Sequence, residues 1–499
     1  MGRHPQTLTP HMTALMERGV RFTHAYSNDP ICAPSRASFL TGLYPHTTGY
    51  FGYDQQAHPW RENPVLGEAR TIMEHFSAHG YDVFGTGKVF HNDHEDDRVW
   101  RRPDGFDGLG IAPSFGPFPW DGTFEGDGGR KRWSPHPATP PPLAGHWEDS
   151  FGPLSRIPAP SADSATAGSG YEGWILFQEP FRYDGPGERD PMPDELNAAW
   201  ADSVLRAERE DPFLLVVGFN RPHTPLYAPQ EYFDRFPLDS LALPEHLEGD
   251  LADCPPGARP PGASWTRDYG FERFANLLAA GGDDSWREWV RAYLACVAFV
   301  DDQIGRVLAS LEASSHADDT VVVLTSDHGY VMGEKEYLFK NALWETSTRV
   351  PLVIVDPRGG ASGAECTQPV SLIDLYPTLV DYGELPPDPN RETNGYPLDG
   401  HSLRPLVDDP ETGRWAGPEV ALMTVGSSDS LADGDPARQH YAVRSTRHRY
   451  VRYADGAEEL YDHQTDPREW VNLAGDPAAR SVKDSLRVQL LRVAGLPPG

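Results

Sequence analysis

The chain has 499 residues, enough for one large α/β domain and a smaller one, and its formal net charge is −31. This acidic excess argues against binding to nucleic acid or to an anionic membrane surface. No apolar stretch approaches the roughly 20 residues of a transmembrane helix, and no signal peptide is evident, so a cytoplasmic location is expected for the chain as written. The four cysteines lie far apart and show neither the spacing of a metal site nor that of a redox motif, so no disulfide framework is predicted. They are Cys32, Cys254, Cys296 and Cys366.

The first chemically distinctive stretch begins at Cys32, after a helix predicted from Thr9 to Gly19. Pro34 suits the first turn of a second helix, and Gly42 suits its left-handed end. Cys32 is therefore expected at a helix N-terminus, where unpaired N–H groups and the positive end of the dipole attract anions. Arg36 follows about one turn later, within reach of the same point. A nucleophile, a cation and amide donors together favour chemistry on an oxyanion.

Polar residues follow two predicted strands further along the chain. Lys88 and His91 come just after the first of these strands. The apolar run from Pro212 to Phe219 is typical of a strand covered on both faces, and Arg221 and His223 follow it. Open α/β sheets bind ligands at such strand ends, so both pairs are candidate site residues.

A third strand, predicted from Thr320 to Thr325, leads directly into Asp327 and His328. A carboxylate and an imidazole side by side suit a divalent metal, although they do not fix its identity. Lys340 follows in the next loop. Lysine is scarce in this chain compared with arginine, so a lysine near a candidate site is more informative here than usual.

The remaining pattern is that of alternating helices and strands, with a long irregular segment over residues 92–190. Asp301 and Asp302 lie within a predicted helix, and we interpret them as a solvated face or a packing contact rather than as metal ligands. Further helices are predicted over 71–79, 194–210, 286–311, 371–382 and 481–493, and further strands over 20–26, 81–84, 349–355, 421–423, 440–444 and 449–453.

The string Cys32-Ala33-Pro34-Ser35-Arg36, continued by Leu40-Thr41-Gly42, resembles the signature of the sulfatase family of the alkaline-phosphatase superfamily. The element Gly87-Lys88-Val89-Phe90-His91 is similar to that of iduronate-2-sulfatase-like members. The resemblance implies an α/β fold with a large, mostly parallel sheet sandwiched by helices. It also implies a catalytic domain over 1–400 and a smaller α+β subdomain, with an antiparallel sheet and a terminal helix, over 401–499.

The same resemblance implies hydrolysis of a sulfate ester to an alcohol and inorganic sulfate. A maturation enzyme would oxidise Cys32 to formylglycine, whose hydrate would attack sulfur. Arg36, Lys88 and a divalent metal, usually calcium in the family, would neutralise the sulfate oxygens. The metal ligands would be Cys32, Asp327 and His328. The groups that contact the ester and its leaving oxygen would be Arg221, His223 and Lys340. His91 would be the base that takes the proton of the remaining hydroxyl group.

Sulfatases also carry an early buried strand that ends in two metal-binding aspartates, and the chain as written shows no such strand before Thr9. The expectation is that Met1 is not the functional start. A site without those carboxylates would bind calcium weakly, because calcium prefers roughly 6–8 oxygen ligands. The chain as written would then be unstable or nearly inactive.

Two alternatives remain open on the sequence. A formylglycine-dependent phosphonate monoester or phosphodiester hydrolase can carry the same Cys-x-Pro-Ser-Arg string, and a truncated, inactive relative could bind anions without turnover. The substrate expected is a small sulfate ester or a terminal sulfated sugar, because a charge of −31 opposes a long polyanion.

Overall fold

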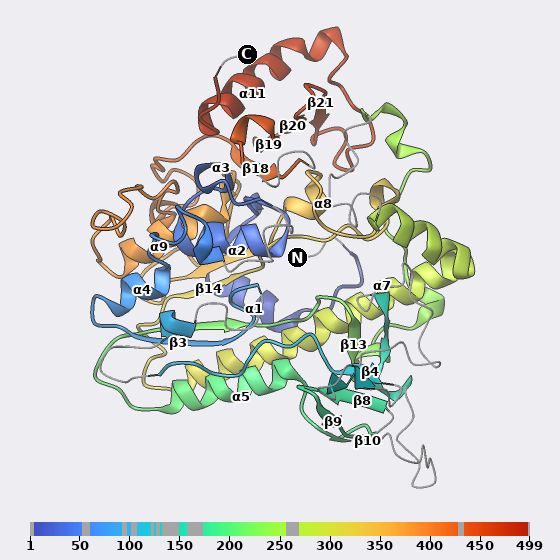
Figure 1. Ribbon diagram of the computed structural model, residues 1–499, viewed down its shortest axis with the longest axis vertical. Coiled ribbons are helices and arrows are strands. Elements are labelled where there is room, and N and C mark those ends of the chain that lie inside the picture. Colours follow the sequence, from blue (N-terminus) through green and yellow to red (C-terminus); the bar gives the residue numbers. More distant parts are fainter. Residues whose placement is uncertain are drawn as a thin grey trace.

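The computed structural model describes residues 4–51, 60–91, 97–100, 107–120, 124–125, 130–131, 149–156, 173–255, 269–427 and 434–497. Two groups of helices enclose the central strands (Figure 1). The helix α5 contacts β3 and β12, whereas α4 contacts β3 from the side occupied by α2 and α9. The longer helices are α1 (Pro10–Arg18), α2 (Cys32–Thr41), α4 (Ile72–Ser77), α5 (Pro193–Arg206), α7 (Tyr269–Glu312), α9 (Leu375–Tyr382) and α11 (Arg480–Val493).

The central strands form two separate sheets within the described residues. One has the order β14-β15-β1-β16, with β1 antiparallel to β15 and parallel to β16, and the other pairs β3 with β12 in parallel. The strands are β1 (Val20–Phe22), β3 (Asp82–Gly87), β12 (Phe213–Gly218), β14 (Val322–Thr325), β15 (Leu352–Val355) and β16 (Ala364–Cys366). The α/β class is confirmed, but the single large and mostly parallel sheet is not present in the described residues.

The two strands expected to be covered on both faces, β12 and β14, are only half-buried along their whole lengths. Within the described part of the chain each lies at the end of its sheet, with a hydrogen-bonded neighbour on one side only. By contrast, all four residues of β15 are buried, because β15 lies between β14 and β1. The apolar runs were correctly identified as strands, and the expected coverage was wrong.

Most predicted elements are present, with local differences. Thr71 caps α4 in a capping box with Glu74, as a Thr-x-x-Glu pattern favours. The helix α7 begins at Tyr269, well before the predicted start at Trp286, and it bends at Gly281 and Gly282. The segment expected to be irregular holds short strands, including the sheet β4-β8-β9 of Phe118–Trp120, Gly173–Leu176 and Glu179–Phe181; other parts of it lie outside the described residues.

The C-terminal part forms a four-stranded antiparallel sheet in the order β18-β19-β20-β21, drawn in red-orange at one end of the molecule (Figure 1). Leu486 and Leu490 of α11 are buried against this sheet. Among the helices of the described residues, none has the length and apolar character needed to cross a bilayer. The strands are β18 (Ala421–Val425), β19 (His440–Arg444), β20 (His448–Arg452) and β21 (Glu458–Asp462).

Candidate active site

The helix α2 places Cys32 at its first position, next to the N-cap Ile31. Gly42 ends the helix in the left-handed conformation, with φ of 72°, and its N–H donates to the carbonyl of Ser38 at 2.8 Å. A Cβ atom at Gly42 would lie 2.5 Å from Leu398 Cδ2, so both the backbone angle and the space require glycine. The side chain of Cys32 is fully buried at the start of this rigid element.

Positive and polar nitrogens surround the sulfur of Cys32. Lys340 Nζ lies 2.9 Å from Sγ, His328 Nε2 lies 3.1 Å away, and Lys88 Nζ lies 3.5 Å away. Burial alone would raise the pKa of the thiol, but Lys340, Lys88 and His328 outweigh it and hold that pKa well below its usual range. Position 32 is therefore built to hold a negatively charged atom.

Arg36 joins α2 to the loops that follow two strands. Its Nε donates to Asp327 Oδ2 at 2.8 Å, and its Nη1 donates to the carbonyls of Lys88 and Val89. Ser35 Oγ donates to the carbonyl of Asp327 at 2.6 Å. Burial opposes ionisation of Asp327, yet Arg36 and His328 hold its pKa below the usual range, so the carboxylate is charged.

The two other expected histidines lie in the same cluster. His223 Nε2 lies 3.1 Å from Lys340 Nζ, and burial together with Lys340 and Lys88 lowers its pKa to about 4. Burial also lowers the pKa of His91, partly offset by its hydrogen bond to Cys32. Both rings are therefore neutral at neutral pH, and each can accept a proton or donate one from a single nitrogen.

Arg221 is held by backbone carbonyls rather than by the groups around Cys32, and its expected contact with substrate stays a prediction. Its Nε donates to the carbonyl of Tyr227 at 2.8 Å, its Nη2 donates to the carbonyl of Gly116 at 3.0 Å, and its Nη1 donates to the carbonyl of Phe115 at 3.1 Å. The side chain is buried, and these carbonyls occupy its donors. Arg221 therefore holds the loop that carries His223.

Two residues near the site escaped the sequence analysis. The ring of Phe115 lies 4.7 Å from Lys88 Nζ and 4.5 Å, centroid to centroid, from the ring of His223. Asp194 is fully buried and accepts hydrogen bonds from the amides of Asn220 and Arg221 at 2.7 and 2.9 Å. Phe115 falls in a segment without periodicity, so no sequence signal marks it. Asp194 was visible only as a residue in the first turn of a helix.

Three possible metal ligands converge here, and they fit calcium only in part. Ligand atoms of Cys32, Asp327 and His328 lie within 4.8 Å of one another. This set offers one carboxylate, and its Oδ2 already accepts a hydrogen bond from Arg36. Calcium takes roughly 6–8 oxygens, so the described side chains do not complete a calcium shell.

Comparison with known proteins matches the chain to two family models. The model described as Sulfatase matches residues 1–384, and the model described as N-sulphoglucosamine sulphohydrolase, C-terminal, matches residues 333–495. A protein named Sulfatase from Formosa agariphila is 32% identical over 97% of this chain and 81% of its own length. Iduronate 2-sulfatase of Mus musculus is 26% identical over 96% of this chain and 89% of its own length.

Solved structures show the same fold. A phosphonate monoester hydrolase from Silicibacter pomeroyi has a TM-score of 0.65 and 23% identity, covering 98% of this chain and 90% of that one. A structure in complex with its substrate D-glucosamine-2-N,6-O-disulfate has a TM-score of 0.61 and 19% identity, covering 98% and 93%. Together these two structures span phosphonate and sulfate chemistry, so their likeness identifies the alkaline-phosphatase-like fold alone. The match of the Sulfatase model over most of the chain decides the family: the chain belongs to the sulfatases, which are sulfuric ester hydrolases.

Proposed function

We propose that this chain hydrolyses small sulfate esters at position 32, after Cys32 has been converted to formylglycine by a maturation enzyme. The observation that carries the proposal is the surroundings of Cys32 Sγ, with two ammonium groups and an imidazole within 3.5 Å. A sulfate monoester is an anion, and these groups neutralise the negative charge that attack on sulfur builds up. The hydrate of formylglycine would supply a hydroxyl group that attacks sulfur, displaces the alcohol and leaves the sulfate bound at position 32.

The chain's own residues would divide the remaining work. Lys88 and Lys340 bind the sulfate oxygens from two sides of position 32. Lys340 and His223, 3.1 Å apart, would protonate or stabilise the departing alkoxide. His91, which hydrogen-bonds to the Cys32 side chain, would take the proton of the remaining hydroxyl group as the C–O bond to sulfate breaks, which releases inorganic sulfate and restores the aldehyde. Arg36 would act near the ester and would also hold Asp327 and the loop that carries Lys88 in place.

A divalent cation at Cys32, Asp327 and His328 would add Lewis-acid stabilisation, and calcium is the candidate from the family. No step above depends on it, because the described ligand set does not complete a calcium shell. The substrate class we propose is a small sulfated molecule such as a terminal sulfated sugar. The neighbour with bound disulfated glucosamine supports this choice.

Phosphonate monoester hydrolysis is the second candidate, supported by the fold shared with the Silicibacter pomeroyi enzyme. Matched sulfate and phosphonate esters of one leaving group separate the two activities. We expect kcat/KM to be larger for the sulfate ester, and a preference for the phosphonate would overturn the proposal. Intact mass and a peptide map around Cys32 report whether formylglycine is present.

The substitution Cys32→Ala tests the assigned position directly. We expect turnover to fall by at least about 1,000-fold with the fold intact, since the nucleophile is removed and the helix is not. Cys254→Ala is the matched control, because Cys254 is partly exposed and lies beside Tyr461 rather than in the cluster. Near-normal activity in Cys32→Ala, with normal circular dichroism, would exclude the mechanism.

A further inference from the structure

A second cationic site lies where α8 (Glu345–Thr348) meets the C-terminal sheet. A cavity of about 390 Å³ opens here, a volume within the roughly 300–1,000 Å³ of small-ligand sites. Its walls include Arg349, Arg444 and Arg447, against one carboxylate, that of Glu345. No residue of its lining belongs to the cluster around Cys32. A local excess of positive charge in a chain of net charge −31 requires an explanation.

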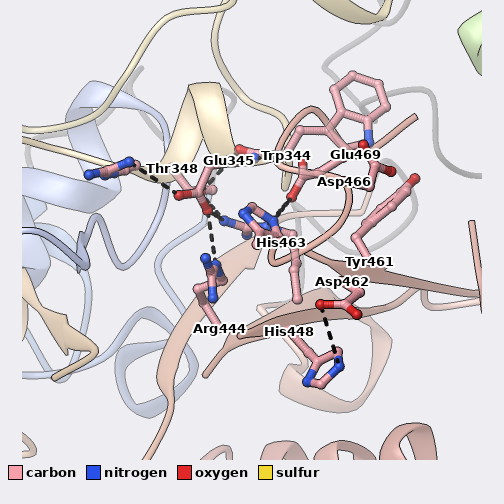
Figure 2. A network of polar contacts seen from close by, with 12 residues as sticks. Trp344, Glu345, Thr348, Arg444, His448, Tyr461, Asp462, His463, Asp466 and Glu469 are labelled. Atoms are coloured by element: carbon pink, nitrogen blue, oxygen red, sulfur yellow. Dashed lines mark hydrogen bonds and ion pairs between the residues drawn. The ribbon is translucent and has the colours of Figure 1, made fainter. Parts of the chain in front are cut away.

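The carboxylates near this cavity are already neutralised. Glu345 Oε2 accepts from Arg444 Nε at 3.2 Å (Figure 2). The same oxygen also accepts from Arg449, and Glu345 Oε1 accepts from Tyr26 Oη at 3.1 Å. Asp462, the acidic partner of Arg447, accepts from its Nε at 2.8 Å and from its Nη2 at 2.6 Å. These acids offset part of the arginine charge: the four guanidinium groups of Arg349, Arg444, Arg447 and Arg449 lie against the three carboxylates of Glu345, Asp462 and Glu469, which leaves an excess of one positive charge.

The arginines, in contrast, keep unused donors. A guanidinium group has five N–H donors, but among the residues that the structure describes Arg349 makes a single ion pair, at 3.8 Å to Glu345. Arg444 uses Nε and one terminal nitrogen, and its side chain is 2% exposed, yet its other terminal nitrogen has no partner in the described part of the chain. Arg447 likewise leaves Nη1 without a partner among those residues. These donors come from two segments, the end of α8 and the turn between β19 and β20, and they line one cavity.

The same arrangement excludes a cation. Glu345, His463 and Glu469 have ligand atoms close enough to hold a metal. However, Arg449 lies between the two carboxylates, with its Nε 2.7 Å from Glu469 Oε1. Burial is the main cause that lowers the pKa of His24, in the cavity wall, to about 4, and the positive charge of Arg444 lowers it further. The His24 ring is therefore neutral at neutral pH, and its pKa reflects the positive charge nearby. The field favours an anion.

We propose that this cavity binds the oxyanion of a small molecule, either a sulfate or a carboxylate, at a site separate from Cys32. Guanidinium groups match both oxyanions because two N–H donors can meet two oxygens. Free sulfate and a uronic-acid carboxylate are the two sources of this chemistry. The proposal does not rest on the hydrolysis assigned above, since binding here needs no turnover.

Equilibrium dialysis of the full chain with labelled inorganic sulfate, at constant ionic strength set by chloride, tests the site. We expect the double variant Arg349→Gln/Arg447→Gln to bind one sulfate fewer per chain, or to bind it at least about tenfold more weakly. The matched control is Arg182→Gln/Arg206→Gln, which removes the same charge and also breaks exposed ion pairs with aspartates. It should bind sulfate as the unmodified chain does.

A second arm replaces sulfate with glucuronate and identifies the source. Loss of glucuronate binding with unchanged sulfate binding assigns the cavity to carboxylates, and the reverse result assigns it to sulfate. Thr446→Trp fills the cavity while keeping every charge, and it provides the test if the double variant does not fold. Equal binding of both anions by the unmodified chain, the double variant and Thr446→Trp would overturn the proposal, whatever the activity of the chain.

Discussion

The residues around Cys32 come from four separate loops, and each places a cationic or polar nitrogen near Sγ of Cys32. Lys340 is the nearest cation, 2.9 Å from Sγ, and it also lies 3.1 Å from His223 Nε2. Lys88 is further away, at 3.5 Å, and makes no such contact with His223. The two lysines therefore differ in what they can do. Lys340 can act on the leaving oxygen through His223, whereas Lys88 can act on the sulfate oxygens.

This difference leads to a prediction about leaving groups. We expect Lys340→Met to lower kcat about 100-fold for an alkyl sulfate and much less for a nitrophenyl sulfate, because a good leaving group needs no proton. Lys88→Met should lower kcat by a similar factor for both esters. The measurement is kcat for a series of sulfate esters of graded leaving-group pKa. An equal loss across the series in Lys340→Met would contradict the assignment.

Much of this cluster could be predicted from the sequence, because its members share one pattern. Lys88 and Asp327 each follow an apolar strand, and strand ends meet at one edge of an α/β sheet. Arg221 follows the same pattern, and yet its guanidinium group donates to backbone carbonyls of the surrounding loops. The carbonyls that occupy it, from Phe115 and Gly116, lie in a segment whose sequence has no periodicity. A local pattern places a side chain near a site but does not reveal distant groups that compete for it.

At the scale of elements, the start of α1 is stabilised by a residue almost 300 positions away. Thr9 occupies the N-cap position, as predicted, but its side chain makes no capping bond. Asp301 of α7 accepts instead from the amides of His11 and Met12, at 3.0 and 2.9 Å. The interpretation of Asp301 as a packing contact is confirmed. The three groups His11, Asp301 and Asp302 are close enough for a metal, but this capping role accounts for Asp301.

A pair of neighbouring variants tests this contact. We expect Asp301→Ala to lower the free energy of unfolding by about 1–2 kcal/mol, because two helix-start amides lose a buried acceptor. Asp302→Ala should cost less than about 0.5 kcal/mol, since Asp302 is partly exposed and pairs with Arg235 near the surface. Urea denaturation of both variants measures the difference. Equal losses would show that Asp301 does not cap α1.

In the C-terminal sheet, His440 of β19 is buried and its Nδ1 accepts a hydrogen bond from the amide of Ala454 at 2.9 Å. An accepting Nδ1 requires the neutral ring, and burial lowers the pKa of His440 to about 4 from an ordinary value near 6.5. Between pH 6.5 and pH 4, His440 therefore binds a proton in the unfolded chain but not in the folded chain. The stability linked to His440 is present above pH 6.5 and is lost as the pH falls toward 4.

His440→Gln should remove this dependence. Between pH 7 and pH 4.5 we expect the unmodified chain to lose up to about 2–3 kcal/mol more than the variant. Burial raises the pKa of Asp374 and of Glu459 to about 7, which gives the opposite slope in the same window. The difference between the two chains, rather than either curve alone, is therefore the measurement. Parallel curves would contradict the role of His440.

The strands β12 and β14 show what an apolar run does not reveal. Their composition led to the prediction of strands buried on both faces, and both are strands, but both are half-buried at the ends of their sheets. Alternation and hydrophobicity report the environment that side chains prefer. They do not report whether a neighbouring strand pairs with the backbone, because that depends on another part of the chain. The incomplete ligand set at Asp327 lies just beyond the end of β14.

At the scale of the whole molecule, two opposite fields act on an anionic substrate. The net charge of −31 repels any polyanion, and the repulsion grows with the number of sulfates. Near Cys32 the field reverses, because Lys88, Lys340 and Arg36 lie together. Local attraction acts on the one sulfate that enters, whereas the remaining sulfates of a long chain stay within the repulsive field. The Debye length of about 10 Å at 0.1 M salt separates the two ranges.

We therefore expect kcat/KM at about 20 mM salt to be higher for a sulfated monosaccharide than for the internal positions of a sulfated hexamer. Raising the salt to about 200 mM should screen the repulsion between the acidic protein and the distant sulfates of the hexamer, and it should also weaken the attraction of the monosaccharide to the site. The ratio of the two kcat/KM values should therefore become smaller. A non-sulfated hexamer carrying one terminal sulfate is the control for size, and it should follow the monosaccharide. If kcat/KM instead rises steadily with the number of sulfates at low salt, a cationic surface must guide the polymer, and the charge argument fails.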